Sequence, residues 1–99
     1  MFRGAAIGLM LTLLVALPAT AQNFQRGLDA AKRGDYGTAL LEWRPLAAKG
    51  HASAQYNLGF MYEEGRGVPL DRIEAAKWYR KAAEQGHANA QRSLGMKYE

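Results

Sequence analysis

A six-residue motif occurs twice in this 99-residue chain, and the distance between its copies strongly constrains the fold. Residues 50–55 read Gly-His-Ala-Ser-Ala-Gln and residues 86–91 read Gly-His-Ala-Asn-Ala-Gln, a shift of 36 positions. Repeats of this length are typical of helix pairs that each bury one face against a neighbour. The spacing therefore predicts an all-α fold, a short α-solenoid of antiparallel helix hairpins.

The same shift relates residues on both sides of the motif. Pairs that match without a gap are Asp35 and Asp71, Ala39 and Ala75, Ala47 and Ala83, Leu58 and Leu94, and Gly59 and Gly95. We therefore divide residues 22–99 into a degenerate repeat (22–50), a full repeat (51–86) and a partial repeat (87–99).

Apolar residues at helical spacing predict about five helices, at residues 22–33, 36–49, 52–64, 72–85 and 88–98. Asp35 and Asp71 are expected N-caps, and Asp71 forms a predicted capping box with Glu74. Pro45 lies inside the second helix, where its missing amide hydrogen predicts a kink or two shorter helices.

Two glycines fall in the middle of predicted helices. Gly59 and Gly95 each cost roughly 1 kcal/mol relative to alanine in that position. We interpret both as packing positions, where the missing side chain allows a partner helix to approach closely. Trp78 is expected to pack between hairpins, and Val68 is expected to lie beneath the connecting turn.

The first 21 residues have the pattern of a cleavable secretory signal peptide. Arg3 precedes an uncharged apolar run at residues 5–17, and small residues then predict cleavage between Ala21 and Gln22. A retained membrane anchor is the alternative, but the run is shorter than the roughly 20 residues of a spanning helix. We expect a periplasmic or secreted protein with no transmembrane segment after cleavage, and the absence of cysteine fits folding without disulfides.

The net charge is mildly positive, +4 for the whole chain, and the basic residues are scattered among acidic ones. Residues 1–21 contain one arginine and no acid, so residues 22–99 carry +3. No basic cluster is dense enough for a nucleic-acid patch. The scattered distribution favours the interpretation that the basic residues belong to a solvated helix surface. The alternative is that their charge attracts the protein to an anionic envelope surface.

Residues 54–86 resemble the Sel1-like repeat, a relative of the tetratricopeptide repeat. The matching positions are Ala54, Gln55, Leu58, Gly59, Met61, Tyr62, Gly65, Gly67, Val68, Asp71, Ala75, Trp78, Tyr79, Ala82, Ala83 and Gly86. The resemblance implies an α-solenoid that acts as an adaptor or scaffold for other proteins, with bacterial members often exported.

Residues with catalytic or metal-binding chemistry are few. His51 and His87 occupy equivalent turn positions, and neither has a carboxylate or cysteine at ligand spacing. Ser53 and Ser93 lack the Gly-x-Ser-x-Gly elbow of a serine nucleophile. We therefore expect no enzyme activity, no metal and no cofactor.

The candidate partner-binding residues are Tyr56 and Phe60, with Arg92 and Met96 at the matching positions of the next repeat. The resemblance places this helix face on the concave side, and aromatic and arginine side chains commonly anchor interfaces. The alternative is that Tyr56 and Phe60 pack against the neighbouring hairpin.

The sequence thus favours an exported adaptor that binds a protein or peptide on its concave face. One alternative is a module that binds cell wall or an anionic envelope ligand, and another is a truncated remnant of a longer repeat protein. Leu94, Met96 and Tyr98 cannot all be buried against the preceding helix. This implies marginal stability, a truncated gene or a homodimer through the C-terminal helix.

Overall fold

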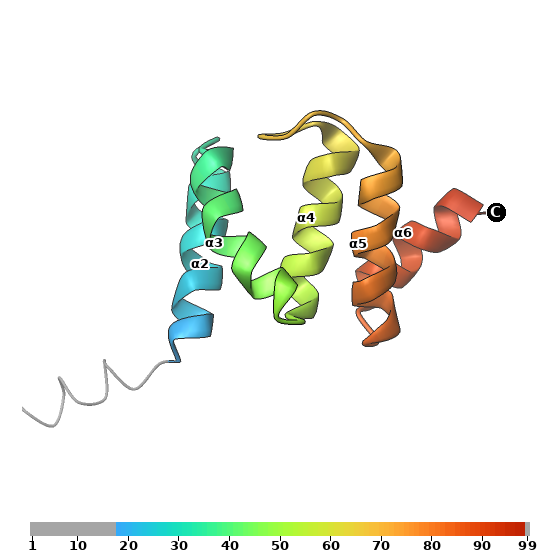
Figure 1. The fold of residues 1–99 in the computed structure, drawn as a ribbon, viewed down its shortest axis with the longest axis horizontal. Helices are drawn as coiled ribbons and strands as arrows, with labels where there is room; N and C mark the ends of the chain where they lie inside the picture. The colour runs from blue at the N-terminus through green and yellow to red at the C-terminus, as the bar shows by residue number, and fades with distance from the viewer. Residues whose placement is uncertain (1–17, 99) are drawn as a thin grey trace, which may run out of the picture.

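The computed structural model describes the backbone of residues 18–98 and side chains as far as residue 95. It contains the helices α2 (Ala19–Lys32), α3 (Tyr36–Ala48), α4 (Ala52–Glu64), α5 (Arg72–Glu84) and α6 (Ala88–Tyr98), with no strand in this range (Figure 1). The all-α solenoid prediction is confirmed. Helix α2 starts at Ala19, before the predicted cleavage point, and residues 1–17 of the predicted signal peptide lie outside the described range.

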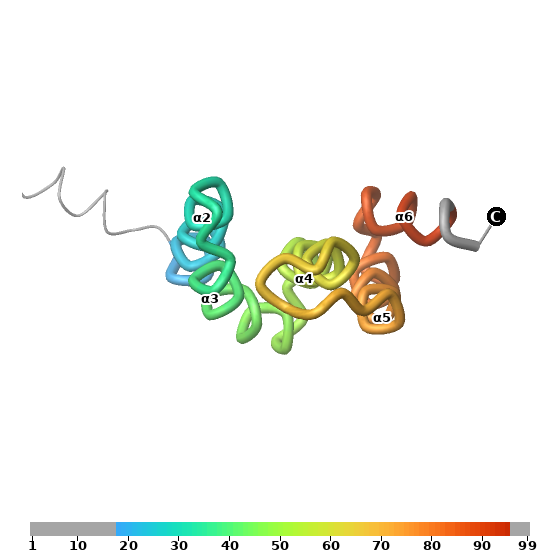
Figure 2. The backbone as a smooth tube through the Cα atoms, turned by 90° about the horizontal axis from the view of Figure 1, so that it is seen from above, coloured from blue at the N-terminus to red at the C-terminus, as the bar shows by residue number. Residues whose placement is uncertain are grey.

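The helices form a row of antiparallel hairpins in which each packs against the next in the chain. Seen from above, the first helices of the hairpins (α2, α4 and α6) lie along one side, and α3 and α5 lie along the other (Figure 2). Within residues 18–98, no helix combines the length and the hydrophobicity that crossing a membrane requires.

The short turn between α2 and α3 contains a left-handed glycine followed by the predicted N-cap, Asp35. Gly34 takes a positive φ of 79°, which a residue with a side chain rarely adopts. Asp35 then accepts a hydrogen bond from the Thr38 backbone N–H at 3.2 Å, and hydrogen bonds from Thr38 lower the pKa of this carboxyl below its usual value. Both features are local, and they turn the chain back within three residues, 33–35.

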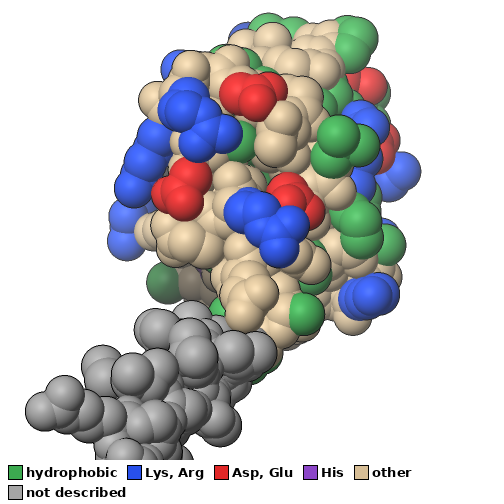
Figure 3. Space-filling view, turned by 90° about the vertical axis from the view of Figure 1, so that its left-hand side faces the viewer, with side chains coloured by type: hydrophobic (Ala, Val, Ile, Leu, Met, Phe, Trp, Pro, Cys, Tyr) green, Lys and Arg blue, Asp and Glu red, His purple; other side chains and the backbone are tan. Residues whose placement is uncertain are grey.

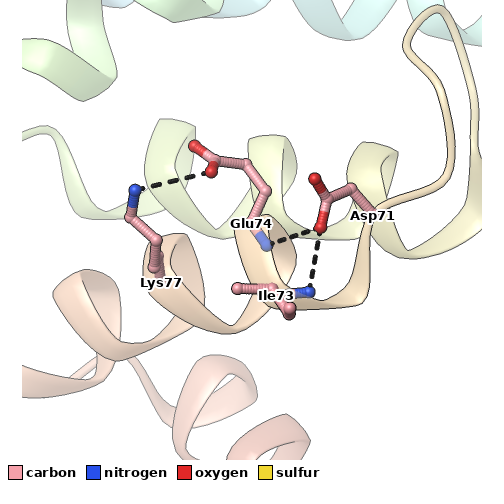
Figure 4. Close-up of polar contacts among 4 residues, drawn as sticks. All are labelled: Asp71, Ile73, Glu74 and Lys77. Carbon is pink, nitrogen blue, oxygen red and sulfur yellow. Dashed lines mark hydrogen bonds and ion pairs between the residues drawn. The ribbon is translucent and has the colours of Figure 1, made fainter.

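The start of α5 forms only half of the predicted capping box (Figure 4). The Asp71 carboxylate accepts hydrogen bonds from the N–H groups of Ile73 (3.1 Å) and Glu74 (3.0 Å). The Glu74 carboxylate does not return to Asp71 but pairs with Lys77 at 3.4 Å. The Asp71 N–H donates to the Tyr62 carbonyl at 2.9 Å instead, so the end of α4 replaces the missing half of the box.

Helix α3 continues through Pro45 from Tyr36 to Ala48. The alternative of two shorter helices is therefore wrong. The ribbon changes direction along α3 (Figure 1), which is the kink expected where proline removes a backbone hydrogen bond and crowds the preceding turn.

The buried apolar side chains form two clusters. The first cluster lies between α2, α3 and α4 and consists of Ala30, Ala39, Leu40, Trp43, Leu46, Ala47, Ala54, Leu58 and Met61. The second cluster lies between α5 and α6 and consists of Ala75, Tyr79, Ala82 and Ala90. Val68 and Trp78 pack against the first cluster as predicted, and Tyr56 and Tyr62 of α4 pack against the second.

A glycine faces an aromatic ring at the centre of both complete hairpins. A Cβ atom added to Gly59 would lie 2.6 Å from the Tyr79 ring, and one added to Gly27 would overlap the Trp43 ring. The packing interpretation of Gly59 is confirmed. At Gly95 no atom of the described residues lies within 4 Å of the equivalent Cβ position, so Gly95 does not serve this role here.

The two glycine–aromatic pairs also show how the first hairpin differs from the second. Trp43 and Tyr79 are 36 residues apart, but Gly27 and Gly59 are 32 apart. The difference of four equals the difference between the turns, which span residues 33–35 and 65–71. The first hairpin is thus built like the second, with a shorter turn.

Candidate protein-binding groove

The two histidines cap helices. The Nδ1 atom of His51 accepts a hydrogen bond from the backbone N–H three residues on at 3.1 Å, and His87 does the same at 3.2 Å. Each ring also stacks on an aromatic ring of the preceding repeat, His51 on Phe24 at 5.0 Å and His87 on Tyr56 at 4.8 Å. These contacts give both histidines a structural role, and residues 18–95 contain no group of three or more potential metal ligands.

The glutamine of the repeated motif fastens each helix to the one before it. Gln55 donates through Nε2 to the Ala47 carbonyl at 3.1 Å, and Gln91 makes the same bond to Ala83 at 3.1 Å. Gln55 is buried, and its side-chain oxygen accepts from Gln85 at 2.9 Å, so both ends of its amide are paired. Burial of a polar group is tolerated when its hydrogen bonds are satisfied. The histidine and glutamine of the repeated six-residue motif therefore have structural roles in the fold.

An open apolar groove of about 140 Å³ lies between the first two hairpins, on the side formed by α2 and α4. Its lining residues are Leu28, Ala31, Tyr36, Trp43, Asn57, Phe60, Met61 and Arg66. This is the side that the first helices of the hairpins share, where a concave binding face was expected. Among these residues Phe60 stands out, because 38% of this large apolar side chain remains exposed.

Arg66 lines this groove and contacts two aromatic rings. Its guanidinium carbon lies 5.7 Å from the Tyr36 ring centroid and 5.6 Å from the Phe60 ring centroid. Its Nη1 atom also donates to the Tyr36 hydroxyl at 3.3 Å. Cation–π contacts at this distance contribute about 0.5–1 kcal/mol each at exposed sites. The three side chains come from different elements and form one cluster.

Two left-handed glycines place Arg66. Gly65 (φ 66°) ends α4, and Gly67 (φ 74°) turns the chain again. A Cβ atom on Gly67 would lie 2.8 Å from the Tyr36 Cβ atom, so only glycine lets the turn lie against the start of α3. Figure 1 shows this loop extending from α4 toward α3 before it returns to α5. The glycine-rich turn is thus a connector that carries an arginine to the groove.

The structure does not bring the four predicted site residues together. Tyr56 packs inward, with its ring 5.5 Å from Tyr79 and stacked on a histidine, so the packing alternative describes it. Phe60 lines the groove. Arg92 is exposed on α6 and does not line the groove, and the side chain of Met96 lies outside the described residues.

Tyr36 and Arg66 were missed as candidates. Each lies next to a turn, where helical periodicity carries no information about side-chain position. The available signal was the Gly65-Arg66-Gly67 triplet, because flanking left-handed glycines fix the direction of the residue between them.

Tyr79 has an unusual environment but a structural role. Its hydroxyl donates to the Glu63 carboxylate at 2.9 Å, and its ring is fully buried in the second cluster. Burial first, and then the hydrogen bond to Glu63, raise the pKa of this phenol far above its usual value of 10.0. The neutral hydroxyl therefore links α5 to α4 as a hydrogen-bond donor.

Charges at the N-terminal end of the molecule are mixed in sign. Figure 3 shows basic and acidic side chains interspersed on this face. One such pair joins Arg26 to Glu42 at 3.3 Å, between α2 and α3. This face offers no continuous basic surface for a polyanion, which fits the sequence interpretation of a solvated helix surface.

The fold and its repeated contacts define a class, the helical-hairpin repeat proteins of the α-solenoid type. Within the chain, residues 52–87 match the family model described as Sel1 repeat. This unit, which comprises α4, the glycine-rich turn, α5 and the following turn, therefore matches the Sel1 repeat, and the predicted resemblance is confirmed. Repeats of this kind are protein-interaction units.

Three relatives are similar to part of the chain. The "DAP3-binding cell death enhancer 1" of Rattus norvegicus is 44% identical over 57 residues, 58% of this chain and 11% of the relative. The "Chitin synthase regulatory factor 3" of Schizosaccharomyces pombe is 50% identical over 44 residues, 44% of this chain and 5% of the relative. The "Exopolysaccharide production negative regulator" of Rhizobium leguminosarum bv. viciae is 40% identical over 56 residues, 57% of this chain and 21% of the relative.

The chain therefore spans only a small part of each of these relatives. No solved structure matches it significantly.

Proposed function

We propose that this chain is a protein-interaction adaptor that acts in the cell envelope and binds a protein or peptide in the groove between α2 and α4. The Sel1 repeat supports an interaction role, and the names of the three relatives describe binding or regulation. The single observation that carries the proposal is the open apolar groove beside a partly exposed phenylalanine, Phe60. Binding sites are typically concave and mostly apolar with a few polar groups, and this groove has that character.

Site-specific photo-crosslinking tests where the partner binds. A benzoylphenylalanine at position 60 should give crosslinked adducts in intact cells. The same residue at position 73 is a matched control, because Ile73 is 79% exposed and does not line the groove. Adducts from position 73 alone, or from both positions equally, would contradict binding in the groove.

The envelope location rests on the signal-peptide pattern of residues 1–21. Mass spectrometry of the mature protein tests it directly, since export with cleavage predicts an N-terminus at Gln22. An N-terminus at Met1 in a cytoplasmic fraction would refute the envelope role and leave the groove proposal intact.

The alternative of an envelope-ligand module is tested by sedimentation with isolated cell wall. Mixed charges on the face shown in Figure 3 favour the protein partner over this alternative. Co-sedimentation that disappears in salt would reverse this preference.

A further inference from the structure

Arg66 brings a positive charge to the lining of the apolar groove. No acidic side chain lines the groove, and Arg66 forms no ion pair within residues 18–95. Its neighbours in the groove are two aromatic rings, Tyr36 and Phe60. Arg66 is exposed, and no acidic side chain of the described residues pairs with it.

The contacts of Arg66 leave most of its N–H donors available. A guanidinium has five N–H donors, and a cation–π contact involves its charge and not these donors. Of these donors, one is directed at the Tyr36 hydroxyl at 3.3 Å. The remaining donors form a planar fork whose geometry matches a carboxylate.

The rest of the groove fits one apolar side chain. Its volume is about 140 Å³. An apolar cavity of about 150 Å³ accommodates a benzene ring. Asn57 also lines the groove and is partly buried, and its side-chain amide can both donate to and accept from a peptide backbone.

We propose that the groove recognises an extended peptide in which an aromatic or branched aliphatic side chain lies next to an aspartate or glutamate. The apolar side chain enters the space between α2 and α4, the carboxylate pairs with Arg66, and Asn57 bonds the peptide backbone. This inference rests on the proposed function, because it names the chemistry of the partner for the same groove.

We assign the anion to an acidic side chain, not to a peptide C-terminus. Capture of a terminal carboxylate commonly uses a nest of backbone N–H groups. In this loop the Arg66 N–H already donates to the Met61 carbonyl at 2.9 Å and the Asp71 N–H to the Tyr62 carbonyl at 2.9 Å. These two N–H groups are thus already used within the fold, and the side-chain fork of Arg66 suits a side-chain carboxylate.

The test is a selection of random peptides on the immobilised full chain, displayed both internally and with free C-termini. We expect enriched internal sequences with Asp or Glu within two positions of Phe, Tyr, Trp, Leu or Ile. Synthetic versions should bind at least tenfold more weakly when Glu is replaced by Gln, and the Arg66→Gln protein should show the same loss. Arg66→Lys, which retains the charge but not the fork, should bind with intermediate affinity.

Arg72→Gln is the matched control, because Arg72 is an exposed arginine at the start of α5 outside the groove, and its affinity should equal that of the wild type. Circular dichroism should show that every variant is folded. Enriched peptides without an acidic residue, or with a required free C-terminus, would overturn this inference and leave the proposed function standing. Failure to enrich any peptide whose binding depends on Phe60 would overturn both.

Discussion

Gly59 and Gly95 occupy the same position in successive repeats, but only Gly59 faces an aromatic ring. Alanine at position 59 would place Cβ 2.6 Å from Tyr79 and 3.2 Å from the Ala75 carbonyl. Overpacking of this kind costs about 1–3 kcal/mol, more than the roughly 1 kcal/mol that helix propensity returns. Gly59→Ala should therefore lower the free energy of unfolding by about 1 kcal/mol.

Gly95→Ala is the matched control, because open space surrounds its Cβ position. Only helix propensity applies there, and the free energy of unfolding should rise by up to about 1 kcal/mol. Urea denaturation of both variants measures the change in the free energy of unfolding. If both substitutions changed it in the same direction, the proposed difference in packing between Gly59 and Gly95 would be contradicted.

Tyr79 predicts a loss of stability at alkaline pH. Its pKa is raised in the folded chain, so above pH 10 the unfolded state releases this proton while the folded state retains it. Stability from this group is complete below pH 10 and falls by at most about 1.4 kcal/mol per pH unit above it. Urea unfolding at pH 8–11 should show this slope.

Tyr79→Phe removes the titration and the hydrogen bond to Glu63 together. At pH 8 the variant should be about 1 kcal/mol less stable than the wild type, the usual worth of such a bond. The difference should shrink above pH 10 and approach zero near pH 11. If the free energy of unfolding of the wild type and of Tyr79→Phe changed with pH in parallel, the pKa of Tyr79 would be the same in the folded and unfolded states, which would contradict this prediction.

Residue-level properties were predictable where neighbours in the chain decide them. Asp35 and Asp71 each depend only on the start of the helix that follows, and both act as the predicted N-caps. The role of Tyr56 depends on which neighbouring hairpin its ring contacts. Helical periodicity predicts which residues share a face of a helix, but not which element packs against that face. Arg66 depends on a loop folded back onto an earlier hairpin, so its place in the groove required the structure.

At the scale of a single element, side chains cap the ends of helices, and α5 is the clearest case. Asp71 accepts from two backbone N–H groups at its start, and removing an N-cap typically costs about 1 kcal/mol. Asp71→Ala should therefore lower the free energy of unfolding by about this amount. Asp71→Asn retains the acceptor oxygen and should remain within a few tenths of a kcal/mol of the wild type.

Thermal denaturation by circular dichroism measures both Asp71 variants. If Asp71→Asn were as unstable as Asp71→Ala, the carboxylate charge near the helix N-terminus, and not the hydrogen bonds, would be the source of stability. The sequence predicted this cap but not the pairing of Glu74 with Lys77, because the Tyr62 carbonyl that replaces the second half of the box lies on another helix.

At the scale of the whole molecule, α4 contributes side chains to both apolar clusters. Leu58 and Met61 belong to the first cluster, and Tyr56 and Tyr62 pack against the second. Sequence periodicity gave the helices and their order, but it did not show that one helix serves both clusters. In a solenoid, stability is approximately a sum of unit and neighbour terms, so protection from unfolding should follow this arrangement.

Hydrogen exchange followed by mass spectrometry should therefore find the slowest amides in α4 and the fastest helical amides in α6. Helix α4 packs extensively against both α3 and α5, whereas α6 packs mainly against α5. Local opening follows the number of buried contacts that must be broken, so the two helices should differ by at least tenfold in protection. Equal protection at low protein concentration would contradict this gradient. Protection of α6 that rises with concentration would instead support the predicted homodimer through the C-terminal helix, because association adds contacts to the helix that lacks them.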